Sequence, residues 1–324
     1  MLYPLEKALI EKVQIIFLNR FKKVVYLNHL FVLNYCSKAF CEKVYSFIVL
    51  SMFIFWGGAD MQVKDKVIIV TGGGSGIGRE LVLNLLSKGA RVAAVDLNTA
   101  GLEETKTLAR EKADRLSLHT VNITEREVVE NLPKQVIEIH GSIDGVINNA
   151  GIIQPFVHIN DLDYDKIKLV MDVNFYGTLY MVKSLLPYLL ERPEAHIVNI
   201  SSMGGFTPVP GQSIYGASKA AVKLMTEGLA SELKDTNVKV TVVFPGAVNT
   251  NITKNSDADH RRNEKKDQDT SKLLQPKDAA EIIVSGMEAN KTRIFAGKDS
   301  KVLDILMRIN PKKAAEMIAN KLKK

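Results

Sequence analysis

Short apolar segments alternate with longer segments of helical pattern between residue 66 and about residue 290. The apolar segments are rich in Val and Ile and are bounded by turn residues, as buried strands are. They cover Val67–Val70, Arg91–Asp96, Gly145–Asn148, Ile197–Ile200 and Val238–Phe244. Helices are expected between them, for example over Gly78–Lys88 and Ala217–Leu233. This alternation predicts an α/β fold, in which helices cover both faces of one doubly wound parallel sheet.

The pattern divides the chain of 324 residues into three parts. Residues 1–60 form an apolar and basic extension, residues 61–290 the α/β domain and residues 291–324 a basic amphipathic tail. Two short helices are expected in the tail, with Asn310 capping the second and Pro311 at its first position. One face of the second helix is apolar, which suits docking on the body, docking on another subunit, or binding to an anionic membrane. That face consists of Ala314, Met317, Ile318 and Leu322.

The N-terminal extension has three interpretations. Its apolar run Val44–Trp56 is shorter than the roughly 20 residues of an ordinary membrane span. The extension is therefore an interfacial membrane anchor, an added structural element, or a segment outside the natural protein. The last interpretation rests on Met61, which directly precedes the first predicted strand and would make a normal start.

The net charge of +7 is concentrated at the two ends of the chain. It divides into +3 for residues 1–60, −3 for residues 61–290 and +7 for residues 291–324. A nucleic-acid-binding domain would carry the basic charge on its folded body, so we expect no nucleic-acid partner. The two cysteines, Cys36 and Cys41, lie in the extension, which excludes a disulfide framework or a cysteine metal site in the domain. We expect no metal and a cytoplasmic location, with the termini as candidates for peripheral contact with a membrane surface.

Tyr215 and Lys219 are four residues apart, a spacing that places both on one face of a helix. A phenol with its ordinary pKa of about 10 is a poor acid or base at neutral pH. A nearby ammonium group favours the phenolate and lowers that pKa. Tyr164 and Lys168 share this spacing, so the spacing alone decides nothing. The context distinguishes the first pair, because Ser202 follows a predicted strand thirteen residues before Tyr215.

A glycine-rich turn directly follows the first predicted strand. Gly72, Gly76 and Gly78 lie where backbone amides and a helix N-terminus can bind a phosphate. Their spacing is G-x-x-x-G-x-G, which differs from the G-x-G-x-x-G of other dinucleotide folds. Asp96 ends the second predicted strand, where a carboxylate accepts hydrogen bonds from a ribose diol and repels a 2′-phosphate. Because neither Ser75 nor Leu97 is a cation, this pattern favours NAD over NADP.

From about Lys64 to Thr250 these motifs resemble the short-chain dehydrogenases/reductases, in their single-domain branch. The resemblance includes Asn148-Asn-Ala-Gly151, Asn174 in the segment Asp172–Gly177, and the segment from Pro245 to Thr250. It departs at Asn122, where the family usually carries an aspartate near the adenine. A single Rossmann-type NAD-binding catalytic domain and a homo-oligomer, dimer or tetramer, are implied. The implied cofactor-binding residues are Gly72, Ser75, Gly76, Ile77, Gly78, Asp96, Asn122, Ile123, Asn148, Ala150, Gly151, Tyr215, Lys219, Pro245, Gly246, Val248 and Thr250.

The resemblance also implies a catalytic set of Asn174, Ser202, Tyr215 and Lys219. Tyr215 would transfer a proton to or from the substrate oxygen, and Ser202 would hydrogen-bond that oxygen. Lys219 would bind the nicotinamide ribose, and Asn174 would hold a water molecule that connects Lys219 to solvent. We therefore expect an NAD-dependent oxidoreductase that interconverts a secondary alcohol and a ketone by hydride transfer.

Two alternative functions stay open. One is a membrane-associated enzyme for a lipid or steroid-like alcohol, suggested by the apolar extension and the basic tail. The other is a non-catalytic NAD-binding scaffold, which usually lacks the tyrosine or the lysine. The substrate is expected to contact Gly204–Gly211, residues such as Gln154, Phe156 and His158, and the polar Thr250–Gln275 loop. That loop is either a solvated insertion or a lid over the substrate, and its position after a strand end favours the lid.

Overall fold

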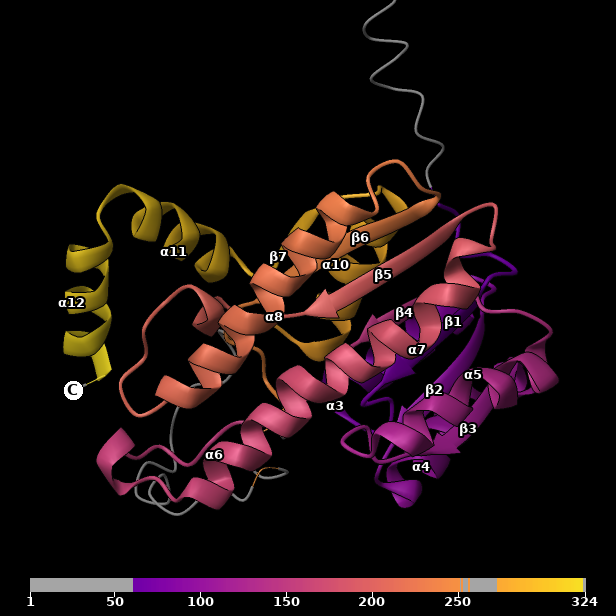
Figure 1. The fold of residues 1–324 in the computed structure, drawn as a ribbon, viewed down its shortest axis with the longest axis horizontal. Coiled ribbons are helices and arrows are strands. Elements are labelled where there is room, and N and C mark those ends of the chain that lie inside the picture. Colours follow the sequence, from indigo (N-terminus) through magenta and orange to yellow (C-terminus); the bar gives the residue numbers. More distant parts are fainter. Residues whose placement is uncertain (1–60, 251, 253–255, 257–272, 323–324) are drawn as a thin grey trace, which may run out of the picture. The chain divides into compact units, whose positions relative to one another are not determined.

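The computed structural model describes residues 61–250, 252, 256 and 273–322 (Figure 1). The interpretations of residues 1–60 and most of the Thr250–Gln275 loop therefore lie outside the described residues. Within the described part, strands and helices alternate along the chain, as the hydrophobic pattern predicts.

Seven parallel strands form one sheet in the order β3-β2-β1-β4-β5-β6-β7. The order reverses direction between β1 and β4, which places a topological switch point at the centre of the sheet. The predicted doubly wound parallel sheet is confirmed. The strands are β1 (Val67–Thr71), β2 (Arg91–Asp96), β3 (Leu116–Thr120), β4 (Gly145–Asn148), β5 (Ala195–Ile200), β6 (Val238–Pro245) and β7 (Arg293–Ala296).

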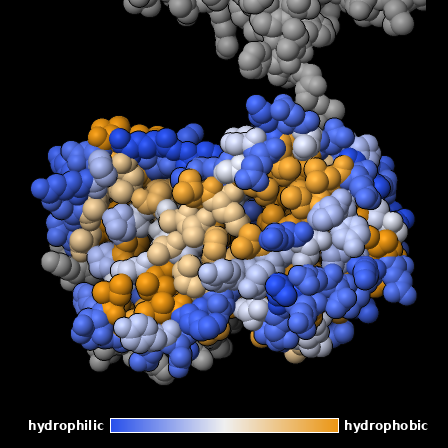
Figure 2. Space-filling view, in the orientation of Figure 1, coloured by the Kyte–Doolittle hydropathy of each residue, from blue (hydrophilic) through white to orange (hydrophobic). Residues whose placement is uncertain are grey.

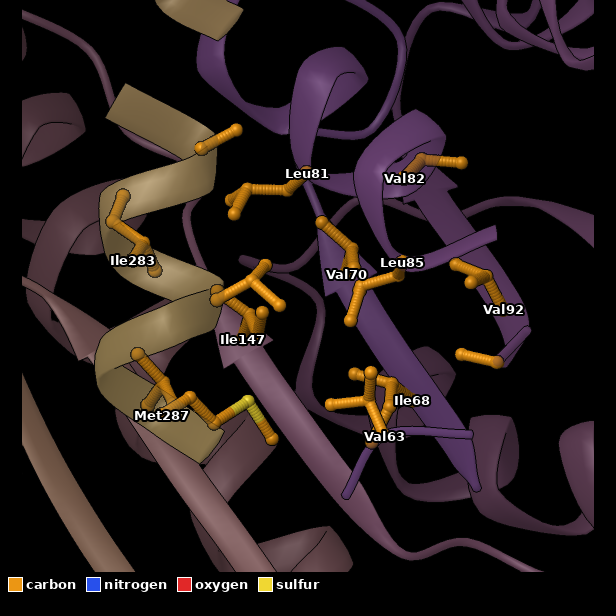
Figure 3. Packing of buried hydrophobic residues seen from close by; sticks show 14 of the residues in the cluster. Val63, Ile68, Val70, Leu81, Val82, Leu85, Val92, Ile147, Ile283 and Met287 are labelled. Atoms are coloured by element: carbon orange, nitrogen blue, oxygen red, sulfur yellow. The ribbon is translucent and has the colours of Figure 1, made fainter. Parts of the chain in front are cut away.

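Helices pack on both faces of this sheet through two separate apolar clusters. One cluster joins α3 (Gly76–Ser87) and α10 (Pro276–Glu288) to the strands. Figure 3 shows Ile283 and Met287 of α10 beside Ile147, with Leu81 and Leu85 of α3 lying across from them. The other cluster joins α5 (Arg126–His140), α7 (Thr178–Leu190) and α8 (Ser213–Glu232) to the opposite face. Two further α-helices of the described body are α4 (Thr99–Ala109) and α6 (Tyr164–Met171), and a π-helical turn, η3 (Asp172–Gly177), leads from α6 into α7.

Two strands lie where the hydrophobic pattern did not predict them. In β3 the residues Ser117 and His119 are buried, so polar side chains interrupt the apolar run that marks a buried strand. The last strand, β7, pairs with β6 through Arg293–Ala296. The sheet therefore extends beyond residue 290, where we expected the α/β domain to end.

The tail folds as two helices, as predicted: α11 (Lys298–Ile309) and α12 (Pro311–Leu322). Asn310 caps α12, because its side-chain oxygen accepts a hydrogen bond from the amide of Lys313 at 3.0 Å. Of the apolar face expected on α12, Ala314 is buried and Met317 is half exposed. Among the described residues, every helix is too short or too polar to form a transmembrane span.

Several large apolar side chains of the described body are exposed to solvent. Leu169, Tyr176 and Leu224 lie on α6, η3 and α8 and are exposed to solvent. Figure 2 shows apolar areas set among hydrophilic residues on the side turned to the viewer. The expected self-association stays a prediction.

Candidate active site

The glycine turn connects β1 to α3 and requires glycine for two separate reasons. Gly72 and Gly76 have φ angles of 71° and 53°, in the left-handed region that side chains disfavour. Gly78 lies so close to the carbonyl oxygen of Gly72 that a Cβ on Gly78 would overlap it. The turn thus brings the N-terminus of α3 to the carboxyl end of β1, where its amides can meet a phosphate.

Asp96 stands beside this turn at the end of β2. Its carboxylate accepts hydrogen bonds from the amides of Gly74 and Asn98, each at 2.9 Å. Asp96 and these two partners line a cavity of about 480 Å³. The predicted residues Ser75, Asn122, Ile123 and Ala150 also line it. The side chain of Asn122 bonds Thr124 and Glu125, so it also shapes the loop after β3. Among the described residues that line this cavity there is no Lys or Arg.

Thr71 joins the glycine turn to the end of β4. Its hydroxyl oxygen accepts hydrogen bonds from the amides of Asn149 and Ala150, both at 3.0 Å, and Asn149 donates back to the carbonyl of Thr71. Asn149 lines this glycine-turn cavity and also a neighbouring cavity that contains Tyr215. The neighbouring Asn148, which we predicted as a cofactor residue, points elsewhere and donates to Asn199 within the sheet at 2.8 Å.

The predicted catalytic side chains converge at the carboxyl end of β5 and the start of α8. Ser202 follows β5, and Tyr215 and Lys219 lie on α8. Ser202 hydrogen-bonds the Tyr215 phenol, and the Lys219 ammonium donates to the carbonyl of Ile200 at 3.0 Å. Ser201 supports this arrangement by donating to the backbone carbonyl of Lys219 at 2.7 Å.

Burial dominates the titration of both residues. It raises the pKa of the Tyr215 phenol above its ordinary value, while the hydrogen bond with Ser202 opposes this rise. Burial also lowers the pKa of Lys219 to about 8. In the protein alone, the loss of hydration outweighs the hydrogen bond with Ser202. The expectation that Lys219 lowers the pKa of Tyr215 stays a prediction.

Asn174 lies in the π-helical turn η3 and is fully buried. Its side chain accepts a hydrogen bond from the amide of Ile152 and donates to the Ile152 carbonyl and to the Ser218 hydroxyl, each at 2.9 Å. Asn174 therefore ties the segment after β4 to α8. A water molecule held by Asn174 stays a prediction.

A second cavity, of about 490 Å³, contains Ser202, Tyr215 and Lys219. It adjoins the glycine-turn cavity, because Ile77, Gly151 and Thr250 line both. Pro245, Gly246 and Val248, from the loop after β6, line its wall as expected. Phe156 also lines it, whereas Gln154 is fully buried outside it and His158 is not among its lining residues. The two cavities therefore lie side by side between the glycine turn and Tyr215.

Some site residues escaped the sequence analysis. Asn149 lies in the Asn148–Gly151 motif and Thr71 directly precedes the glycine turn, but the sequence does not show that the two residues bond each other. Asp299, at the start of α11, accepts a hydrogen bond from the amide of Ala247 at 2.8 Å. No sequence signal marks Asp299, because 52 residues separate the two partners.

Comparison with known proteins agrees with this geometry. The family model described as short chain dehydrogenase matches residues 66–261. This chain belongs to the short-chain dehydrogenase/reductase family. A Mycobacterium tuberculosis protein named as an oxidoreductase, SadH, is 36% identical over 252 residues, which cover 76% of this chain and 91% of SadH. The chain is therefore an oxidoreductase of this family.

Solved structures of short-chain dehydrogenases/reductases share the fold. The enzyme of Burkholderia phymatum in complex with NAD has a TM-score of 0.68 and 22% identity, covering 77% of this chain and 96% of its own. The closed form of a serine dehydrogenase complexed with NADP+ has a TM-score of 0.61 and 27% identity, covering 68% and 88%. Neighbours with either cofactor therefore occur, and the choice for this chain depends on its own residues.

Proposed function

We propose that this chain is an NAD-dependent dehydrogenase that interconverts a secondary alcohol and a ketone, with Tyr215 as the general acid and base. The observation that carries the proposal is that Ser202, Tyr215 and Lys219 line one cavity, which adjoins the glycine turn. A bound nicotinamide would supply the hydride acceptor or donor. The turn fits such a cofactor, because Gly72 and Gly78 leave its backbone open to a pyrophosphate.

Each side chain of the site would then have a separate role in the reaction at the substrate oxygen. Tyr215 accepts the hydroxyl proton of the alcohol during oxidation and returns it to the ketone oxygen during reduction. Ser202 donates a hydrogen bond to the same oxygen and stabilises the negative charge that develops there. Lys219, held by the Ile200 carbonyl, places a buried positive charge on the same helix as Tyr215. This charge favours the phenolate when the proton leaves.

Asp96 supports NAD rather than NADP as the cofactor. Two backbone amides hold its carboxylate at the edge of the glycine-turn cavity. A 2′-phosphate placed there would meet a negative charge, without a Lys or Arg among the described lining residues to offset it. The nearby Arg79 is already paired with Glu104 at 2.6 Å.

The cavity at Tyr215 supports an apolar, uncharged alcohol as the substrate. Ile153, Phe156, Met203, Val209 and Leu273 line it. Within the described part of this lining, Lys219 is the charged side chain, and it is bonded to the Ile200 carbonyl. A substrate carboxylate or phosphate would therefore find no free cation there.

Replacing Tyr215 with Phe tests the proposed function. We expect Tyr215→Phe to bind NAD as tightly as the native protein, since the phenol serves proton transfer. Turnover of secondary alcohols should fall about 100- to 10,000-fold, the usual contribution of a general acid or base. Calorimetric titration with NAD and with NADP, followed by an alcohol screen monitored by nicotinamide absorbance, measures both effects. Tyr164→Phe is the matched control, because Tyr164 precedes Lys168 at the same spacing but is 88% exposed.

Each outcome has a distinct meaning. Tighter binding of NADP than of NAD would contradict the role of Asp96. Near-native turnover by Tyr215→Phe would overturn the assignment of the acid and base. A folded native protein that binds NAD but turns over no alcohol would support the scaffold alternative, and one that binds neither cofactor would overturn the proposed function.

A further inference from the structure

Gln154 makes three side-chain hydrogen bonds near the site, and no step of the proposed reaction uses it. It was expected to contact the substrate, but it is fully buried and does not line the cavity. Its side-chain oxygen accepts hydrogen bonds from the amides of Ile214 at 2.8 Å and Tyr215 at 3.0 Å. Its side-chain nitrogen donates to the carbonyl of Gly211 at 2.9 Å.

These bonds complete the N-terminus of α8. The first amides of any helix lack acceptors within the helix, and an N-cap side chain usually supplies one. In α8 the N-cap residue is Gln212, whose side chain makes no capping bond. Gln154, from the segment after β4, performs this function from outside the helix. Tyr215 is one of the two residues whose amides it binds.

Gln212 at the start of α8 also donates a hydrogen bond back to the segment after β4. Its side-chain nitrogen donates to the backbone carbonyl of Gln154 at 2.8 Å, and both residues are buried. Gly211 has a φ angle of 79°, which turns the chain tightly before the helix. The segment after β4 and the start of α8 are thus joined by four hydrogen bonds that involve the two glutamines.

We propose that Gln154 is a positioning residue for Tyr215: its amide group fixes the first turn of α8 and so the place of the phenol beside Ser202. The proposal rests on the proposed function, because it assigns Gln154 to the residue that transfers the proton. A neutral amide suits this place. It accepts from two helix amides and donates to a carbonyl, which a carboxylate cannot do.

Substitutions at Gln154 separate positioning from stability. Gln154→Ala removes all three side-chain bonds, so the phenol should lose its fixed place. We expect kcat to fall on the order of 10- to 100-fold, as a misplacement of about 1 Å produces, with an unchanged Kd for NAD. Gln154→Glu keeps two acceptor bonds and should recover part of the lost kcat. Asn310→Ala is the control, because it removes the cap of α12, outside the site.

Two results would overturn the proposal. One is a lower Tm for Gln154→Ala with kcat per folded molecule within about twofold of native, which shows a structural role alone. The other is equal turnover by Gln154→Ala and Gln154→Glu. If Gln154→Ala does not fold, Gln154→Glu and Gln154→Met, which fills the same space without accepting a hydrogen bond, provide the comparison.

A measurement without substrate distinguishes this proposal from the proposed function. The ¹³Cζ NMR signal of Tyr215, assigned by its loss in Tyr215→Phe, reports the surroundings of the phenol. We expect Gln154→Ala to shift or broaden it and Asn310→Ala to leave it unchanged. An unchanged signal in Gln154→Ala contradicts the positioning role. Failure of the native protein to oxidise any alcohol contradicts only the proposed function.

Discussion

Two helical glycines differ in the space around them: a Cβ would clash with backbone at Gly78 but meet nothing at Gly228. Replacing each with alanine should therefore change the stability of the fold in opposite directions. Gly78 on α3 lies against the carbonyl of Gly72, whereas Gly228 on α8 has no neighbour within 4 Å of the place a Cβ would occupy. Both lie in helices, where alanine is intrinsically favoured over glycine by about 1 kcal/mol. The local contacts therefore decide whether replacing each glycine with alanine raises or lowers the stability of the fold.

We expect Gly78→Ala to destabilise the fold by about 1–3 kcal/mol, because the new methyl group meets backbone that must shift. NAD binding should weaken with it, since the displaced backbone belongs to the glycine turn. Gly228→Ala should stabilise by about 0.5–1 kcal/mol and leave the Kd for NAD unchanged. Urea unfolding and calorimetry measure both quantities. Equal stability changes in the two variants would contradict this account.

At the scale of elements, α11 shapes the site through its first turn. Asp299 accepts from the amide of Ala247, and Ser300 donates to the carbonyl of Phe244 at 2.8 Å. The carboxylate of Asp299 occupies the space where a Cβ on Gly246 would lie. The tail thus holds the loop after β6, which lines the cavity that contains Tyr215.

Asp299→Ala is expected to weaken NAD binding about 2- to 10-fold, as the loss of one hydrogen bond of about 1 kcal/mol implies. The control is Asp304→Ala on the same helix, because Asp304 bonds Arg293 and Arg308 and does not touch the loop. Both variants should lose some stability, but only the first should change the Kd. An equal change of Kd in both would show that α11 acts through stability alone.

The elements also show where sequence reasoning reaches its limit. The central strands and the sites at their ends were predictable, because buried parallel strands leave a continuous apolar run and the glycine turn follows β1 directly. Strand β3 was not predictable, because its buried residues Ser117 and His119 are polar and interrupt the apolar run. They are accommodated in the core by bonding each other at 2.8 Å. The roles of Gln154 and Asp299 were hidden for another reason. Each bonds a partner about 50 or more residues away, and such pairings follow from tertiary packing.

On the scale of the whole molecule, the stability of the fold should depend on pH through its buried histidines. His196 on β5 is fully buried, and its Nε2 lies 2.8 Å from the hydroxyl of Thr241. That hydroxyl donates to the carbonyl of Lys291, so it accepts from His196. The Nδ1 atom has no hydrogen-bond partner among the described residues. A second proton on this ring would therefore be buried without an acceptor.

Burial, with a smaller contribution from Lys239, lowers the pKa of His196 from 6.5 to about 3. In the unfolded chain the ring regains an ordinary pKa, so the unfolded state binds a proton below about pH 6.5 that the folded state does not. The stabilising effect is complete above pH 6.5 and is lost as the pH falls towards 3. At pH 4.5 this one residue should reduce the free energy of unfolding by about 2.5 kcal/mol. His119 and His140, whose pKa values burial also lowers, should add to the loss.

His196→Gln isolates this effect, because it keeps an N–H donor near Thr241 but does not titrate. We expect it to be less stable than the native protein at pH 7.5 and to lose less free energy of unfolding between about pH 6.5 and 4.5. Urea unfolding at several pH values gives the two curves. Val198→Ala on the same strand is the control: it removes buried volume without a titrating group, so its curve should run parallel to the native one. If the curve of His196→Gln is parallel as well, the acid sensitivity of the fold arises elsewhere than at His196.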